Sequence, residues 1–153
     1  MRKSVLETKS EIVVWLVHLG PLGSCPRASR LSRYFPKARL VCEAPGVVVC
    51  NVDSSNILKR LRNFERLVFG HFDGYLNSKF DVIAPKAVEQ PSHIICFDLL
   101  LVPRLLSRFP NAELWFDARE YYPREFEHRW LWKYTFARLA DFVCRKYLPL
   151  ISG

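Results

Sequence analysis

Strongly apolar runs alternate with amphipathic stretches along most of this chain. The runs EIVVWLVHLG at 11–20 and SHIICFDLL at 92–100 are rich in aliphatic residues and contain few polar interruptions. Runs of this kind are typical of strands that are buried on both faces of a parallel sheet. Shorter apolar runs predict three further strands, at 38–45, 47–52 and 112–118.

Two stretches in the first half of the chain have helical features. The loop after the first run contains two glycines and two prolines and leads into a short helix through Phe35, with Ser24 as its N-cap. The segment 53–72 is the clearest helix, because apolar residues recur there at helical spacing and predict a buried stripe. That stripe consists of Ile57, Leu61, Phe64 and Val68. Gly70 marks the end of the helix.

The second half of the chain is less regular at first. Residues 73–91 show poor periodicity and predict a loop with at most one helical turn. Helices are expected at 100–109, with Pro103 in the first turn, and from about 125 to 147. The apolar residues 148–151 would begin another strand.

The alternation of strands and helices predicts an α/β fold: a Rossmann-like, doubly wound, mostly parallel sheet with helices on both faces. We expect residues 1–10 to form a flexible N-terminus and residues 11–153 to form a single domain. Because the chain stops where another strand would begin, we expect this domain to be truncated at its C-terminal end.

The composition excludes several classes of protein. Half of the 153 residues are hydrophobic and 14% are aromatic, which excludes intrinsic disorder. The longest uninterrupted apolar run, at 12–17, is far shorter than the roughly 20 residues of a membrane-spanning helix. Five irregularly spaced cysteines without a CxxC pair predict buried thiols and a cytoplasmic protein. No HxH or HExxH spacing predicts a metal site.

The net charge of +8 is concentrated near the N-terminus. Residues 1–40 contain eight Lys and Arg against two Glu. Such a patch suits an anionic partner, whether a phosphorylated ligand, an anionic lipid or nucleic acid. We do not expect nucleic acid, because the chain has neither a zinc motif nor an RNP-like aromatic run.

Polar residues follow the predicted strands at the positions where an open parallel sheet binds ligands. Gly20 and Gly23 lie in the loop after the first strand, where glycine lets the backbone approach a ligand. Asp98 follows the strand in 92–100 and would either cap the next helix or contact a ligand.

The segment WFDAREYYPREFE at 115–127 carries the densest group of candidate binding residues, namely Asp117, Arg119, Glu120 and Tyr122. Carboxylates accept hydrogen bonds from sugar hydroxyls, arginine pairs with phosphate, and tyrosine stacks on sugar rings. The segment therefore predicts a site for a polyhydroxylated ligand. A structural arginine–carboxylate network at a helix start is the alternative.

The sequence DAREYYP at 117–123 resembles the D-A-H-E-aromatic-x-P motif in the N-terminal domain of family 4 glycosyltransferases of the GT-B fold. The flanking sequence also resembles that family, with an apolar strand, an aspartate and a leucine-rich helix upstream and a long helix downstream. The similarity is best over 92–153, whereas 11–35 agree only in kind.

The resemblance implies the acceptor-binding N-terminal half of a retaining enzyme that moves a sugar from a nucleotide-sugar to a glycan or lipid-linked acceptor. Asp117, Arg119, Glu120 and the loop 20–23 would face the cleft between this half and a C-terminal donor-binding domain or subunit. The half would bind no cofactor or metal of its own and would be inactive alone, so its catalytic residues are not identified. Arg119 replaces the family's histidine, and a proton-transfer role is not carried over.

Two alternatives remain open. The chain could be a non-catalytic Rossmann-type module that binds an anionic partner, either a phosphorylated ligand or nucleic acid. The aromatic and basic stretch 125–147 either contacts the inner face of the membrane peripherally or is a core helix with a solvated basic face. In either case a truncated domain would expose apolar surface and favour self-association.

Overall fold

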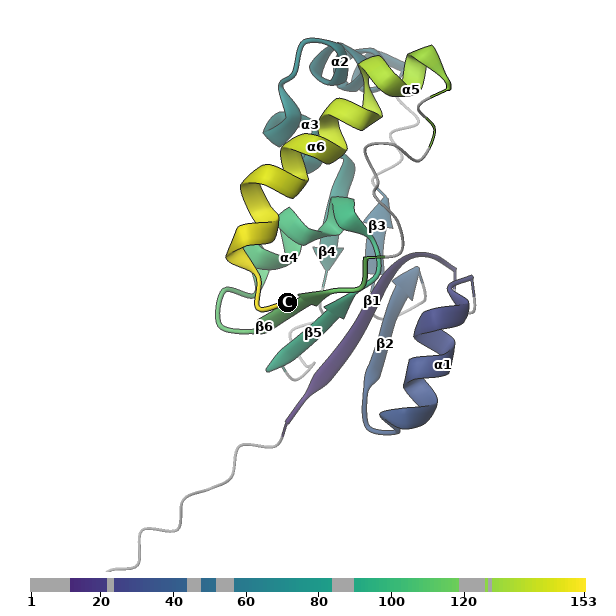
Figure 1. The fold of residues 1–153 in the computed structure, drawn as a ribbon, viewed down its shortest axis with the longest axis vertical. Coiled ribbons are helices and arrows are strands. Elements are labelled where there is room, and N and C mark those ends of the chain that lie inside the picture. The colour runs from purple at the N-terminus through teal and green to yellow at the C-terminus, as the bar shows by residue number, and fades with distance from the viewer. Residues whose placement is uncertain are drawn as a thin grey trace, which may run out of the picture.

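A four-stranded parallel sheet forms the centre of the computed structural model (Figure 1). The model describes residues 12–21, 24–43, 48–51, 57–83, 90–118, 126 and 128–153. The strands of this sheet are β1 (Val14–Pro21), β2 (Arg39–Glu43), β5 (His93–Cys96) and β6 (Glu113–Phe116), in the order β2-β1-β5-β6. All three pairings are parallel. The predicted α/β class with a doubly wound parallel sheet is confirmed.

Helices cover both faces of this sheet (Figure 1). One face packs against α1 (Pro26–Tyr34), and the other packs against α4 (Val102–Arg108) and α6 (Phe136–Tyr147). A 3₁₀ turn, η1 (Leu99–Leu101), leads into α4. The predicted helix at 100–109 and its proline in the first turn are confirmed.

Side chains of β1 alternate between two hydrophobic cores, as the two-residue period of a strand requires. Trp15 and Val17 enter the larger core on the side of α4 and α6, where the Trp15 ring meets Phe109 edge-on at 5.2 Å. Leu16 enters the smaller core with Ala28 of α1. The continuous apolar run therefore reflects burial on both faces.

The start of α1 differs from the sequence prediction. The N-cap is Cys25 and not Ser24, and its side chain makes no capping hydrogen bond. Pro26 occupies the first helical position, as expected. Because proline has no backbone N–H, this helix start has one donor fewer to satisfy, and a polar cap is less needed.

A small antiparallel sheet of β3 (Val48–Asn51) and β4 (Phe80–Ile83) stands apart from the parallel sheet. The short strand expected at 47–52 exists, but it pairs outside the main sheet. The helices between these two strands are α2 (Ile57–Val68) and α3 (Phe72–Lys79).

The prediction of a loop at 73–91 is wrong for its first half, which forms α3 and β4. Phe72 and Tyr75 are buried, and their rings contact Phe142 and Phe136 of α6 at 5.2 and 6.4 Å. These contacts reach across more than sixty residues of sequence. Tertiary packing therefore stabilises a helix whose own periodicity is weak.

The helix α2 is confirmed, but its predicted buried stripe is exposed. Ile57, Leu61 and Phe64 are 70%, 61% and 53% exposed, and Leu67 is the only residue of α2 that is buried. Gly70 ends the helix as expected, with φ of +80°. The His71 amide donates to the Arg66 carbonyl at 2.8 Å, which is the bond that closes a Schellman motif.

The long helix expected from 125 to 147 is divided into α5 (Trp130–Tyr134) and α6. Thr135 breaks it, with φ of −123° and ψ of −87°, and its hydroxyl donates to the Leu131 carbonyl. A threonine hydroxyl that bonds a carbonyl of the preceding turn competes with the helical backbone and bends it.

The end of the chain also differs from the prediction. Residues 148–150 form a 3₁₀ turn, η3 (Leu148–Leu150), and not the start of a strand. Strand-like bonds appear only afterwards, where the Ser152 amide donates to Leu114 and the Phe116 amide donates to the Gly153 carbonyl. The last two residues therefore lie along the β6 edge of the sheet. In the part of the chain that the structure describes, every helix is too short or too polar to span a bilayer.

The role of Gly70 predicts a contrast between two glycines. Gly70→Ala would force a Cβ-bearing residue into the left-handed region and lower the free energy of unfolding by about 1–2 kcal/mol. Gly74→Ala lies inside α3, where the new methyl group would meet Arg66 only at ordinary contact distance, and would be neutral or stabilising by up to about 1 kcal/mol. Urea denaturation of both variants measures the contrast, and equal stabilities would contradict it.

A polar link between α3 and α6 predicts a pH-dependent stability. Partial burial raises the pKa of Asp73, but hydrogen bonds from Lys146 at 2.7 Å and Tyr147 at 2.5 Å outweigh this and hold that pKa below its ordinary value. A lowered pKa stabilises the fold above the unfolded-state pKa, and this contribution is lost as the pH falls through the folded-state pKa.

We therefore expect Asp73→Asn to lower the melting temperature slightly at pH 7, by about 2 °C or less because the link is half-exposed. The difference from wild type should vanish in acid. Asp141→Asn, which removes an ion pair within α6, is the matched control. A difference that grows in acid would contradict this account.

Candidate functional site

The candidate site lies at the carboxyl edge of the parallel sheet. Val17, Cys96 and Phe116 are neighbours in the ladder, so the residues that follow these strands meet at one edge. The chain leaves β1 toward β2 on one side and later returns to place β5 on the other side. The strand order therefore reverses between β1 and β5, which is where α/β sheets bind ligands.

Gly20 lies near the end of β1, where the register of its pairing with β2 shifts between Val17 and Pro21. Its φ is +95°, and a Cβ at this position would lie 2.9 Å from the rotatable Ser24 Oγ. The backbone angle therefore favours glycine here, whether or not a ligand is present.

Asp98 joins the ends of the two central strands. The Leu19 amide of β1 donates to Asp98 Oδ2 at 2.6 Å. Although Asp98 occupies the N-cap position of η1, its side chain makes no capping bond there, so the capping interpretation is wrong. Its extended backbone, with φ of −126° and ψ of 115°, directs it instead toward β1.

Cys96, two residues before Asp98, is structural. Its thiol contacts the Asp98 carbonyl at 3.2 Å and is fully buried. Burial raises the pKa of Cys96 far above its usual range, and the nearby Asp98 charge raises it further, despite that hydrogen bond. A thiol that stays protonated is a poor nucleophile, so Cys96 is not a candidate catalytic residue.

A cavity of about 200 Å³ opens beside Asp98 on the α6 face of the sheet. Its lining residues are Leu19, Asp98, Leu99, Leu100, Trp132, Phe136 and Ala140. Trp132 stacks on Phe136 with ring centroids 5.5 Å apart, and Phe126 meets Trp132 edge-on at 5.0 Å. The Trp132 indole N–H is buried and has no partner among the described residues. The cavity is thus lined by aromatic and aliphatic side chains together with the Asp98 carboxylate.

Asp117 lies on the opposite face, beside α1. Its Oδ1 accepts a hydrogen bond from Arg27 at 2.9 Å, in an ion pair that is partly exposed. The pair borders a groove of about 500 Å³, lined by Arg27, Arg30, Leu31, Tyr34, Ile95 and Asp117. The structure therefore brings Asp98 and Asp117 to the same edge but places them in two separate cavities.

Four predicted site residues, Gly23, Arg119, Glu120 and Tyr122, lie outside the described residues. Their place relative to the two cavities stays a prediction. Asp117 and Ala118 directly follow β6, so the segment 119–122 starts from the carboxyl edge of the sheet.

Sequence reasoning did not identify Trp132 as a candidate. The long-helix prediction passed through Thr135, where the structure divides the stretch into α5 and α6. His18 of β1 is 1% exposed, with Nδ1 lying 2.9 Å from the Leu19 carbonyl oxygen. Its Nε2 has no partner within the described part of the chain.

Within the described residues, no group of three or more His, Cys, Asp or Glu is placed to hold a metal ion. Comparisons with models of protein families, with curated proteins and with solved structures find no match.

The bond between Leu19 and Asp98 predicts the effect of two substitutions. Asp98→Ala would leave the Leu19 amide without its acceptor and lower the free energy of unfolding by about 1–3 kcal/mol. Asp98→Asn keeps an oxygen acceptor and would lose less. Hydrogen exchange at the Leu19 amide should be fastest in the alanine variant. Unchanged exchange at this amide in Asp98→Ala would show that the bond does not hold the two strands together.

Proposed function

We propose that this chain is the acceptor-binding half of a retaining glycosyltransferase. The complete enzyme would move a sugar from a nucleotide-sugar to a glycan or lipid-linked acceptor, and a C-terminal donor-binding domain or subunit would bind the nucleotide-sugar. The observation that carries the proposal is the aromatic cavity beside Asp98 at the reversal of strand order.

The groups around the cavity suit a sugar. A carboxylate offers about four acceptor sites, and Asp98 lines this cavity, so its oxygens suit the hydroxyl hydrogens of a sugar. The aromatic and aliphatic walls can pack against the C–H face of the ring, and the buried Trp132 indole N–H would reach a sugar oxygen after a shift of its ring on binding. Hydrogen bonds made in such an enclosed place are stronger than in water.

The resemblance of 117–123 to the family 4 motif supports the same proposal. This segment starts at Asp117, at the same edge as Asp98. Arg119, Glu120 and Tyr122 would extend the acceptor site from there and, with Gly20 and Gly23, would face the cleft toward the donor-binding half. The cytoplasmic location belongs to the proposal, because nucleotide-sugars are the expected donors.

The alternative is a non-catalytic module that binds a phosphorylated ligand. The groove beside α1 supports it, because Arg27 and Arg30 both line that groove. Arginine is well suited to phosphate through its planar set of donors. The two functions differ in which cavity is used, so variants in each cavity separate them.

Binding to a panel of oligosaccharides and glycolipids is the first test. We expect a subset to bind, and Trp132→Phe, which removes the indole N–H but keeps an aromatic ring, should weaken binding about fivefold to tenfold. Asp141→Asn on the exposed side of α6 is the control and should bind as wild type does. The native protein from its source cells should also transfer a labelled sugar from a nucleotide-sugar.

Two results would contradict the proposal. One is the absence of any glycan binding together with the absence of sugar transfer by the native protein. The other is binding of phosphorylated ligands that is lost in the Arg27→Gln, Arg30→Gln double variant and unaffected by Trp132→Phe. That second result would favour the non-catalytic module.

A further inference from the structure

The helix α2 presents an apolar stripe to solvent. Besides Ile57, Leu61 and Phe64, the exposed large apolar residues of this region are Leu58, Val68 and Phe69. Most of them share one face of the helix, because they follow each other at intervals of three or four residues. An amphipathic helix normally buries such a stripe, and contiguous exposed apolar surface marks an interaction site.

The neighbouring helix α5 extends this surface. Trp130, Leu131 and Tyr134 are exposed, and Trp130 is 73% exposed. Figure 1 shows α2 and α5 at the same end of the molecule, far from α1. We name the surface formed by residues 57–69 and 129–134 the α2–α5 crest.

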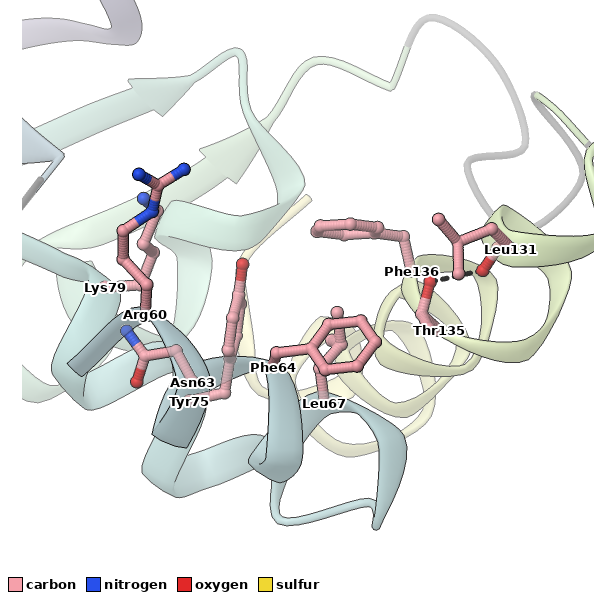
Figure 2. Close-up of a pocket in the computed structure, with 9 residues that line it drawn as sticks. All are labelled: Arg60, Asn63, Phe64, Leu67, Tyr75, Lys79, Leu131, Thr135 and Phe136. Carbon is pink, nitrogen blue, oxygen red and sulfur yellow. Dashed lines mark hydrogen bonds between the residues drawn. The ribbon is translucent and has the colours of Figure 1, made fainter. Parts of the chain in front are cut away.

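A cleft of about 310 Å³ lies between the crest, α3 and the start of α6 (Figure 2). Its lining residues are Arg60, Asn63, Phe64, Leu67, Tyr75, Lys79, Leu131, Thr135 and Phe136. Figure 2 shows Arg60 and Lys79 at one end of the cleft and Leu131 and Phe136 at the other. The cleft therefore has a cationic end and an apolar end.

Exposed basic residues surround the apolar residues of the crest. They are Arg60 and Arg62 on α2, together with Arg129 and Lys133 at α5, whereas the exposed Lys59 lies on the opposite side of α2. Glu65 is the only acidic residue in the crest. Arg60 and Arg62 lie on either side of the apolar stripe, as helical spacing requires.

We propose that the α2–α5 crest binds the surface of an anionic phospholipid bilayer. The aliphatic and phenyl side chains would enter the boundary between headgroups and acyl chains, and the basic side chains would contact lipid phosphates. Tryptophan and tyrosine favour this boundary because each has an apolar body and a polar tip. A second copy of the chain does not suit the crest, because two surfaces with the same excess of positive charge would face each other.

This proposal revises which residues would touch a membrane. The stretch 125–147 was a candidate by sequence, but α6 buries Leu139, Ala140 and Val143 in the core. Only α5 from that stretch belongs to the crest, and α2 supplies most of the apolar surface. The proposal goes beyond the proposed sugar transfer and holds whether or not the chain binds a glycan.

The test is co-sedimentation of the protein with two kinds of vesicle. One contains phosphatidylcholine alone, and the other contains about a third phosphatidylglycerol. We expect at least tenfold stronger binding to the anionic vesicles and weaker binding as salt is raised. Leu58→Gln with Leu61→Gln, and separately Arg60→Glu with Arg62→Glu, should each reduce binding about tenfold or more, because all four side chains are exposed and lie in or beside the apolar stripe.

The matched control is Leu150→Gln with Arg108→Glu, which replaces one exposed apolar and one exposed basic side chain outside the crest. This control should bind vesicles as wild type does. The proposal is overturned if wild type does not prefer anionic vesicles, or if the control loses as much binding as the crest variants. It is also overturned if wild type is a dimer that Leu58→Gln with Leu61→Gln converts to a monomer, since the crest would then be an interface between two copies.

Discussion

The candidate site depends on the hydrogen bond from the Leu19 amide to the Asp98 carboxylate, which joins the ends of β1 and β5. The ladder between β1 and β5 continues only as far as the bond from the Phe97 amide to the Val17 carbonyl. Beyond that point the two segments separate, since β1 continues beside β2 as far as Pro21 and the other segment enters η1. The Asp98 side chain closes this gap at 2.6 Å and in doing so brings a carboxylate to the edge of the aromatic cavity.

Phe136 connects the two surfaces that we assign. It lines the cavity beside Asp98 and also the cleft between the α2–α5 crest and α3. It stands at the start of α6, directly after the break at Thr135, and it stacks on Trp132. If the crest lies on a bilayer, an acceptor carried by a lipid would approach the cavity from the side that this ring borders. The break at Thr135 thus has a consequence for the site as well as for the fold.

The main sheet could be predicted because burial on both faces leaves a direct mark on the sequence, as in the apolar run of β1. The helix α3 could not, because its stability depends on Phe72 meeting Phe142, a contact across seventy residues. The partner of Asp98 is likewise seventy-nine residues away, so local pattern suggested a cap instead. Periodicity correctly identified α2 as a helix, but it does not show whether another part of the molecule covers the apolar stripe. Arg119, Glu120 and Tyr122 remain predictions from the sequence alone.

The central claim is that ligand binds in the cavity between the ends of β1 and β5. The most direct measurement is a ¹H–¹⁵N spectrum of the labelled protein during titration with a glycan that binds it. We predict that the largest shifts occur at the Trp132 indole N–H and at the amides of Leu19, Gly20 and Leu99. Shifts confined to α1 around Arg27 and Arg30, with these signals unchanged, would contradict the account and place the ligand on the opposite face of the sheet.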